Sequence, residues 1–341
     1  IFPRFAKRKL NTVAEVKDAR SGKAYDYPAI LLFRKYNGKL RPVWMFPMSL
    51  NLIEFTYGQA LQTALRESSP TWVREYLSPW EGYDRVKVTL TQHLSLNKQV
   101  VSGDTTKMDA HMRPAQIRLV YEIVKEAFHK SEWPGLYKSL MHVNRISLLC
   151  SPKYQYVSNA HGLASGSGWT QLTETILQLF MAWKRNFVGQ GIGDDFYWVT
   201  DMTAEEMVSY LAEFGLPANR DKQGVGVGEV TFLQRRNLRS LPSRDDQHVV
   251  GGYYRTLRAL NSCLWPEKFH DPRSWSSDMF CVRIFTILEN CCDDACFEEF
   301  VKFVCHGQKD LIPFAKKKNG AIDAAWRRSR LIPGLNPSYN Q

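Results

Sequence analysis

The chain has 341 residues, and its 45 Lys and Arg residues outnumber its 34 Asp and Glu residues, which gives a net charge of +11. A composition of 44% hydrophobic and 23% charged residues excludes an intrinsically disordered chain, and the length allows one large domain or two to three subdomains. The positive charge favours a polyanionic partner such as nucleic acid. No apolar run approaches the roughly 20 residues of a membrane span, so we expect no membrane partner.

A basic hairpin is predicted first along the chain. Apolar residues 29–33 predict a buried strand, and Asn37-Gly38 predicts a tight turn into a second strand. Lys39 and Arg41 are two positions apart, so both side chains lie on one face of that strand, and this pair of cations is suited to bind a triphosphate. A solvated edge strand guarded by lysine is the alternative.

Two further stretches place acidic or glycine-rich residues beside a predicted element. Asp104 and Asp109 follow a β-branched lead and precede a helix that Pro114 can open, so both carboxylates can face one cavity. A Gly/Ser loop over residues 162–168 leads directly into an apolar helix from Thr170, and such a helix start offers free N–H groups to phosphate. Turn and cap aspartates, and a flexible linker, are the respective alternatives.

Residues 191–199 contain adjacent carboxylates, Asp194 and Asp195, after two glycines and before a β-like aromatic run. We expect a hairpin with both acids at or beside its tip. Neighbouring carboxylates repel, so the pair needs a cation such as Mg²⁺ or exposure to solvent. A solvated turn is the alternative when the motif is taken alone.

The remaining sequence predicts supporting elements. Residues 203–206 form a capping box that opens a helix, and Lys222 lies in a loop after it. Residues 229–236 resemble a strand ending in a basic turn, and 250–312 are mostly helical. Among the seven cysteines no zinc-finger spacing occurs, which favours reduced thiols. A metal cluster is a minor alternative for these residues: Cys292, Cys296, Cys305 and His306.

The order of these motifs resembles that of viral RNA-dependent RNA polymerases. The resemblance covers about residues 28–240, and the wording of residues 40–47 and 165–171 is most similar to picobirnavirus polymerases, then to partitivirus enzymes. It implies an α+β right-hand fold with fingers, a palm holding a small antiparallel sheet, and a helical thumb, incomplete at one or both ends. The implied subdomains are fingers 1–97 and 113–164, palm 98–112 and 165–240, and thumb 241–341.

The resemblance also implies residue roles. The catalytic residues would be Asp104, Asp194, Asp195 and Lys222, of which the three aspartates would hold Mg²⁺, with Mn²⁺ as an alternative, and the lysine would be the proton donor. The nucleotide-binding residues would be Lys39, Arg41, Asp109, Ser165, Gly166, Thr170 and Glu174. The RNA or primer grip would be Phe232, Leu233, Gln234 and Arg235. Many family members carry Asn at the position of Glu174, although related double-stranded-RNA viruses also use an acid there.

The implied function is template-directed RNA synthesis for a virus with a double-stranded RNA genome. The expected partners are RNA template and product, ribonucleoside triphosphates and a capsid protein, with the polymerase acting as a monomer in host cytoplasm and virion interior. A reverse transcriptase is the nearest alternative enzyme, but it normally has an aromatic residue where this chain has Ile192. A basic RNA-binding protein without catalytic activity is the other alternative, but RNA binding alone would not explain three acidic motifs in this order.

Overall fold

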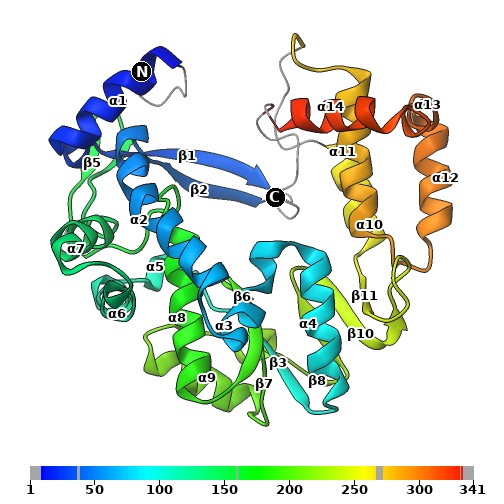
Figure 1. Ribbon diagram of the computed structural model, residues 1–341, viewed down its shortest axis with the longest axis horizontal. Coiled ribbons are helices and arrows are strands. Elements are labelled where there is room, and N and C mark those ends of the chain that lie inside the picture. The colour runs from blue at the N-terminus through cyan, green and yellow to red at the C-terminus, as the bar shows by residue number, and fades with distance from the viewer. Residues whose placement is uncertain (1–8, 37–38, 159, 266–271, 331, 333–341) are drawn as a thin grey trace. The chain divides into compact units, whose positions relative to one another are not determined.

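The computed structural model describes residues 9–36, 39–158, 160–265, 272–330 and 332. It is an α+β structure (Figure 1) that divides into two compact units, the first formed by residues 1–80 and 101–225 and the second by 81–100 and 226–341. The predicted α+β class is confirmed. These units do not coincide with the predicted boundaries of fingers, palm and thumb, which stay predictions. Among the described residues, no helix has the length and apolar character needed to cross a bilayer.

The first unit contains the acidic motifs and a larger number of helices than strands. Its α-helices are α1 (Lys9–Ser21), α2 (Met48–Glu67), α3 (Thr71–Tyr76), α5 (Met108–His111), α6 (Pro114–Val124), α7 (Trp133–His142), α8 (Thr170–Lys184) and α9 (Ala204–Glu213). Its short 3₁₀ helices are η2 (Lys23–Asp26), η4 (Lys125–Ala127), η5 (Lys130–Glu132) and η6 (Arg220–Lys222), while η3 (Ser78–Glu81) lies where the chain passes into the second unit.

Two four-stranded sheets accompany these helices. One has the order β2-β1-β4-β5, with β1 (Ala29–Tyr36), β2 (Lys39–Met45), β4 (Leu148–Ser151) and β5 (Tyr154–Tyr156). The other has the order β6-β7-β3-β8, with β3 (Gln99–Gly103), β6 (Val188–Ile192), β7 (Asp195–Val199) and β8 (Gly224–Val227). The acidic motifs therefore lie at the ends of neighbouring strands of the second sheet.

Helix α8 is the central support of the first unit. The middle of the helix is buried on all sides, since residues 172–179 are all buried, and the helix packs against β6 (Figure 1). Trp169 at its start and Trp198 on β7 are 1% and 0% exposed, and both belong to one large apolar core. Burial of this extent supplies the main driving force for folding, so α8 and the β6–β7 hairpin are held as one body.

The second unit has its own sheet and core. Its sheet has the order β11-β10-β9, with β9 (Glu229–Phe232), β10 (Arg235–Pro242) and β11 (Val250–Tyr253). Its helices are α4 (Tyr83–Ser95), α10 (Thr256–Leu264), α11 (Ser277–Asn290), α12 (Phe297–Gly307), α13 (Leu311–Ala315) and α14 (Asn319–Ser329). The core forms around α11, whose Val282 and Ile284 are fully buried.

Most predicted elements are present. Strands β1 and β2 form the expected antiparallel hairpin, although Asn37 and Gly38 lie outside the described residues. Helix α6 begins at Pro114, α8 begins at Thr170, and the capping box at the start of α9 has both of its hydrogen bonds.

One local prediction was wrong. Residues 229–236 are not a strand ending in a basic turn, because β9 pairs with β10 through Phe232 and Arg235. The turn between them is Leu233-Gln234, with φ of 49° and 63°. Neither residue type favours positive φ, so the sequence carried no turn chemistry at this position.

Candidate active site

The β6–β7 hairpin carries the adjacent acids at its tip, as the sequence predicted. Ile192 pairs with Asp195, which leaves Gly193 and Asp194 as a two-residue turn, and Gly193 has φ of +59°. Glycine at this first turn position matches the tight hairpin geometry. Asp194 is exposed at the turn, and Asp195, the first residue of β7, is partly buried.

A hydrogen bond ties this turn to helix α8. The backbone N–H of Gly193 donates to Oγ1 of Thr175 over 2.8 Å, and Thr175 is fully buried. Because α8 is itself fixed in the core, the bond sets the position of the carboxylates relative to the helix. Thr175 is a site residue that the sequence did not reveal, since a threonine inside an apolar helix looks like core.

Asp104 follows strand β3 directly and reaches the same region. Gly103 is necessary there because a Cβ at its position would lie 2.0 Å from a ring atom of Phe196 on β7. The peptide of Asp104 is held by the buried side chain of Gln223, whose Nε2 donates to the Asp104 carbonyl at 3.0 Å. Gln223 Oε1 accepts from the Asp104 N–H at 3.3 Å.

Lys222, the predicted proton donor, lies beside Asp104. Its Nζ is 2.9 Å from Asp104 Oδ2, and both side chains are about half exposed. Such an exposed ion pair contributes little to folding, so its interest is positional. The loop after α9 therefore brings a cation to the first aspartate motif, and the role of Lys222 as proton donor stays a prediction.

The carboxylates of the site destabilise one another when ionised. Burial, followed by the charges of Asp194 and Asp104, raises the pKa of Asp195 to about 7. The surrounding protein also desolvates Asp194 and, with Asp109 and Asp104, raises its pKa, while Arg41 acts in the opposite direction. The site thus has an excess of negative charge that a bound cation would relieve.

Asp109 and Glu174 form a second acidic pair next to the hairpin. Burial raises the pKa of Glu174 well above its usual range, and the charge of Asp109 and a hydrogen bond to it act in the same direction. Glu174, if protonated, would be able to donate to Asp109. Oε1 of Glu174 and Oγ1 of Thr170 are buried without a hydrogen-bond partner among the described residues. These two atoms are suited to receive polar groups of a ligand.

The Ser/Gly loop lies between strand β2 and helix α8. The backbone N–H of Trp44 donates to Oγ of Ser165 at 3.4 Å, and a Cβ on Gly166 would lie 1.8 Å from the carbonyl oxygen of Trp44. Arg41 lies on the same strand, directly opposite Arg34 in the β1–β2 register. Lys39 opens β2, but its side chain lies outside the described part of the chain.

The predicted RNA grip forms the β9–β10 hairpin of the second unit. Phe232 is 2% and Arg235 6% exposed, and Arg235 stacks over Tyr83, so these two side chains belong to the unit's interior. Leu233 and Gln234 at the turn are the partly exposed members. The RNA-gripping role of this segment stays a prediction.

The donor set of the site fits a hard divalent cation, because carboxylate oxygens are the ligands that Mg²⁺ and Mn²⁺ prefer. The side-chain oxygens of Asp104, Asp194 and Asp195 do not all lie within 4.8 Å of one another. Asp104 is instead directed to Lys222. The residues therefore fit a metal by charge and ligand type, and Asp104 is the member of the set that is paired with Lys222.

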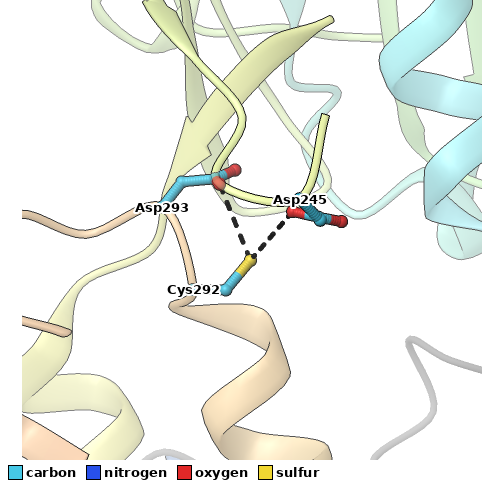
Figure 2. A group of neighbouring side chains, drawn as sticks. All are labelled: Asp245, Cys292 and Asp293. Carbon is cyan, nitrogen blue, oxygen red and sulfur yellow. Dashed lines mark hydrogen bonds between the residues drawn. The ribbon is translucent and has the colours of Figure 1, made fainter. Parts of the chain in front are cut away.

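A different acidic group lies in the second unit, where ligand atoms of Asp245, Cys292 and Asp293 are within 4.8 Å of one another. Figure 2 shows the Cys292 thiol directed to both carboxylates, with Sγ–O distances of 3.9 and 3.7 Å. Burial, then Asp293 and Asp245, raises the pKa of this thiol to about 11. A metal-binding cysteine must be a thiolate, a form that burial and the two neighbouring carboxylates disfavour without a bound cation.

Other groups already engage these carboxylates. Asp245 accepts from Lys87 Nζ at 2.9 Å, and Asp293 accepts from the backbone N–H groups of Arg244 and Gly252 at 2.8 and 2.9 Å. The group therefore secures the loop between β10 and β11. Within the described residues, the minor alternative of a cluster from Cys292, Cys296, Cys305 and His306 is not formed.

The chain is similar to viral polymerases in both sequence and structure. The chain is 26% identical over 311 residues to a potential RNA-dependent RNA polymerase of human picobirnavirus. The aligned region covers 85% of this chain and 56% of that protein. The crystal structure of the RNA-dependent RNA polymerase of a human picobirnavirus matches 92% of the chain with a TM-score of 0.77 at 24% identity. The chain has the right-hand polymerase fold.

An insertion-loop deletion mutant of that polymerase matches 90% of the chain with a TM-score of 0.78, again at 24% identity. The predicted resemblance to picobirnavirus polymerases is confirmed in both sequence and fold. The chain spans 61–63% of the length of these solved structures. No family model matches the chain.

Proposed function

We propose that the chain is the catalytic part of a viral RNA-dependent RNA polymerase that replicates and transcribes a double-stranded RNA genome. The observation that carries the proposal is the placement of Asp104, Asp194 and Asp195 at the ends of two neighbouring strands, β3 and β7, with Lys222 beside Asp104. The similarity to a picobirnavirus polymerase supports this function. RNA template, RNA product and ribonucleoside triphosphates are the proposed partners.

Nucleotidyl transfer joins the 3′-oxygen of the growing strand to the α-phosphorus of a nucleotide and breaks the bond to pyrophosphate. Two divalent cations, when bound by the aspartates, lower the pKa of the attacking hydroxyl and neutralise charge on the leaving group. Asp104 and Asp194 would be the principal ligands, and Asp195 would support them from the start of β7. Lys222 would protonate the leaving pyrophosphate as general acid.

The neighbouring residues would bind the nucleotide. Arg41, whose charge already acts on Asp194, would contact the triphosphate, and a guanidinium can do so bidentately. Asp109, Thr170 and Glu174 would read the ribose 2′-hydroxyl, and the unpartnered oxygens of the latter two are suited to it. The virion interior and host cytoplasm as places of action, a capsid contact and a monomeric state are parts of the same proposal.

The test is extension of an RNA template with labelled ribonucleotides at increasing Mg²⁺ concentrations, for the unmutated chain and for Asp194→Asn. The variant keeps the size of the side chain but loses its charge. We expect metal-dependent incorporation by the unmutated chain and loss of at least about 100-fold in the variant. Incorporation that survives Asp194→Asn, or that prefers deoxynucleotides, would overturn the proposal, the latter in favour of a reverse transcriptase.

A further inference from the structure

Helix α2 directs a buried acid, Glu54, at the Ser/Gly loop. The residue is 2% exposed. Its Oε1 accepts from Ser167 Oγ at 2.6 Å, and its Oε2 accepts from the Gly168 N–H at 2.7 Å. Oε2 also accepts from Asn51 Nδ2, within the same helix, at 2.9 Å. Two of these bonds thus connect α2 to a loop more than 100 residues further along the chain.

The same loop is also confined from strand β2 and the first turn of α2. Asn51 Nδ2 donates to the Gly166 carbonyl at 3.2 Å, and Gly166 leaves no room for a Cβ against Trp44. A Cβ on Gly168 would meet the Phe55 ring at 2.8 Å. Contacts from β2 and α2 therefore confine the loop, and Glu54 supplies the acceptors for Ser167 and Gly168 in its second half.

Burial of Glu54 opposes the charged form of this acid. Burial raises the pKa of Glu54 to about 7, even though hydrogen bonds from Ser167, Gly168 and Asn51 act in the opposite direction. A buried carboxyl of this kind gives little net stabilisation, and an apolar residue of similar size often does as well. Its effect is therefore to be sought in the geometry of the loop that it holds.

The loop leads directly to the atoms that would read the sugar. Ser167 Oγ also accepts from the Trp169 N–H at 3.1 Å, and Trp169 precedes Thr170, the first residue of α8. We propose that Glu54 is a positioning residue for sugar selection, because it fixes the loop that sets the start of α8. This inference rests on the proposed polymerase function, which it extends to a residue outside the acidic motifs.

The test compares two substitutions of Glu54 with a control on the same helix. In Glu54→Gln the amide oxygen can accept from Gly168, and the Ser167 hydroxyl can turn to accept from the amide nitrogen, so the loop keeps its bonds. Glu54→Leu leaves the Gly168 N–H without an acceptor. Leu61→Ala opens a cavity in the core that α2 shares, so it reports a merely structural effect.

The first measurement is the ratio of kcat/KM for ribonucleotide over deoxynucleotide incorporation. We expect Glu54→Leu to lower this ratio about tenfold or more, Glu54→Gln to stay within about threefold of the unmutated chain, and Leu61→Ala to keep the ratio while lowering the melting temperature. Equal loss of selectivity in Leu61→Ala, or an unchanged ratio in Glu54→Leu, would overturn the inference.

The second measurement, amide hydrogen exchange by mass spectrometry, needs no activity. Peptides covering residues 164–170 should exchange faster in Glu54→Leu but not in Glu54→Gln. Where Glu54→Leu does not fold, Ser167→Ala removes one loop-side donor and should show a smaller change of the same kind. Unchanged exchange would contradict the positioning role. Absence of nucleotide incorporation by the unmutated chain would instead count against the proposed function and leave the exchange result to decide on Glu54.

Discussion

The hydrogen bond between Thr175 and the hairpin turn gives the sharpest prediction. Thr175→Val keeps the shape of the side chain but leaves the buried Gly193 N–H without an acceptor. An unsatisfied buried donor costs about 1–3 kcal/mol. Asp194 and Asp195 move with the turn, so the lost bond should also displace these carboxylates. If the whole free-energy cost is added to the activation barrier of extension, the extension rate falls by about 5- to 150-fold.

Two variants separate this effect from general destabilisation. Thr175→Ser keeps the hydroxyl and loses a methyl group, so it should cost about 1 kcal/mol of stability with little loss of extension rate. Thr173→Val makes the same change on a buried threonine of α8 whose hydroxyl donates to the Trp169 carbonyl within its own helix turn. Urea unfolding and single-turnover extension measure both effects. An extension rate in Thr175→Val equal to that of Thr173→Val would refute the reasoning.

Three further predictions concern the same site. Glu174→Leu should lower the preference for ribonucleotides about tenfold, whereas Glu174→Gln, which mimics the protonated acid, should retain the preference. Steady-state kcat/KM values for ribonucleotides and deoxynucleotides check this. The pKa of Asp195 is about 7 in the folded state and roughly 3.9 in the unfolded state. Without divalent cation, the melting temperature should therefore fall as the pH rises from about 4 to about 7, and Mg²⁺ should raise the melting temperature most near pH 8. A melting temperature that does not change with pH would contradict this. Gly103→Ala places a Cβ against the Phe196 ring and should destabilise the chain by about 1–3 kcal/mol in urea, so wild-type stability would argue against the packing described.

Local chemistry made several elements predictable from the sequence. Apolar periodicity placed α6 and α8, Pro114 marked the start of the first, and the capping box marked the start of α9. Gly193 at the first position of a two-residue turn determined the hairpin that presents Asp194 and Asp195. In each case the residues that define the element lie within a few positions of one another.

Residues that act across long separations were not predictable. Thr175, Gln223 and Glu54 each hold a backbone segment of the site through a side-chain bond, and nothing near them in sequence shows the partner. The Leu233-Gln234 turn was missed for another reason, since its positive φ values are imposed by the pairing of β9 with β10. Tertiary context therefore decided these features.

Single-nucleotide incorporation is the measurement that shows whether this chain copies RNA. Four RNA templates that differ only in the templating base would each be offered the four ribonucleotides separately, with Mg²⁺. We expect addition of the complementary ribonucleotide on each template and no addition by Asp194→Asn. Addition that ignores the templating base would indicate a terminal transferase, and RNA binding without any addition would indicate a non-catalytic RNA-binding protein. Either result would exclude template-directed RNA synthesis by this chain.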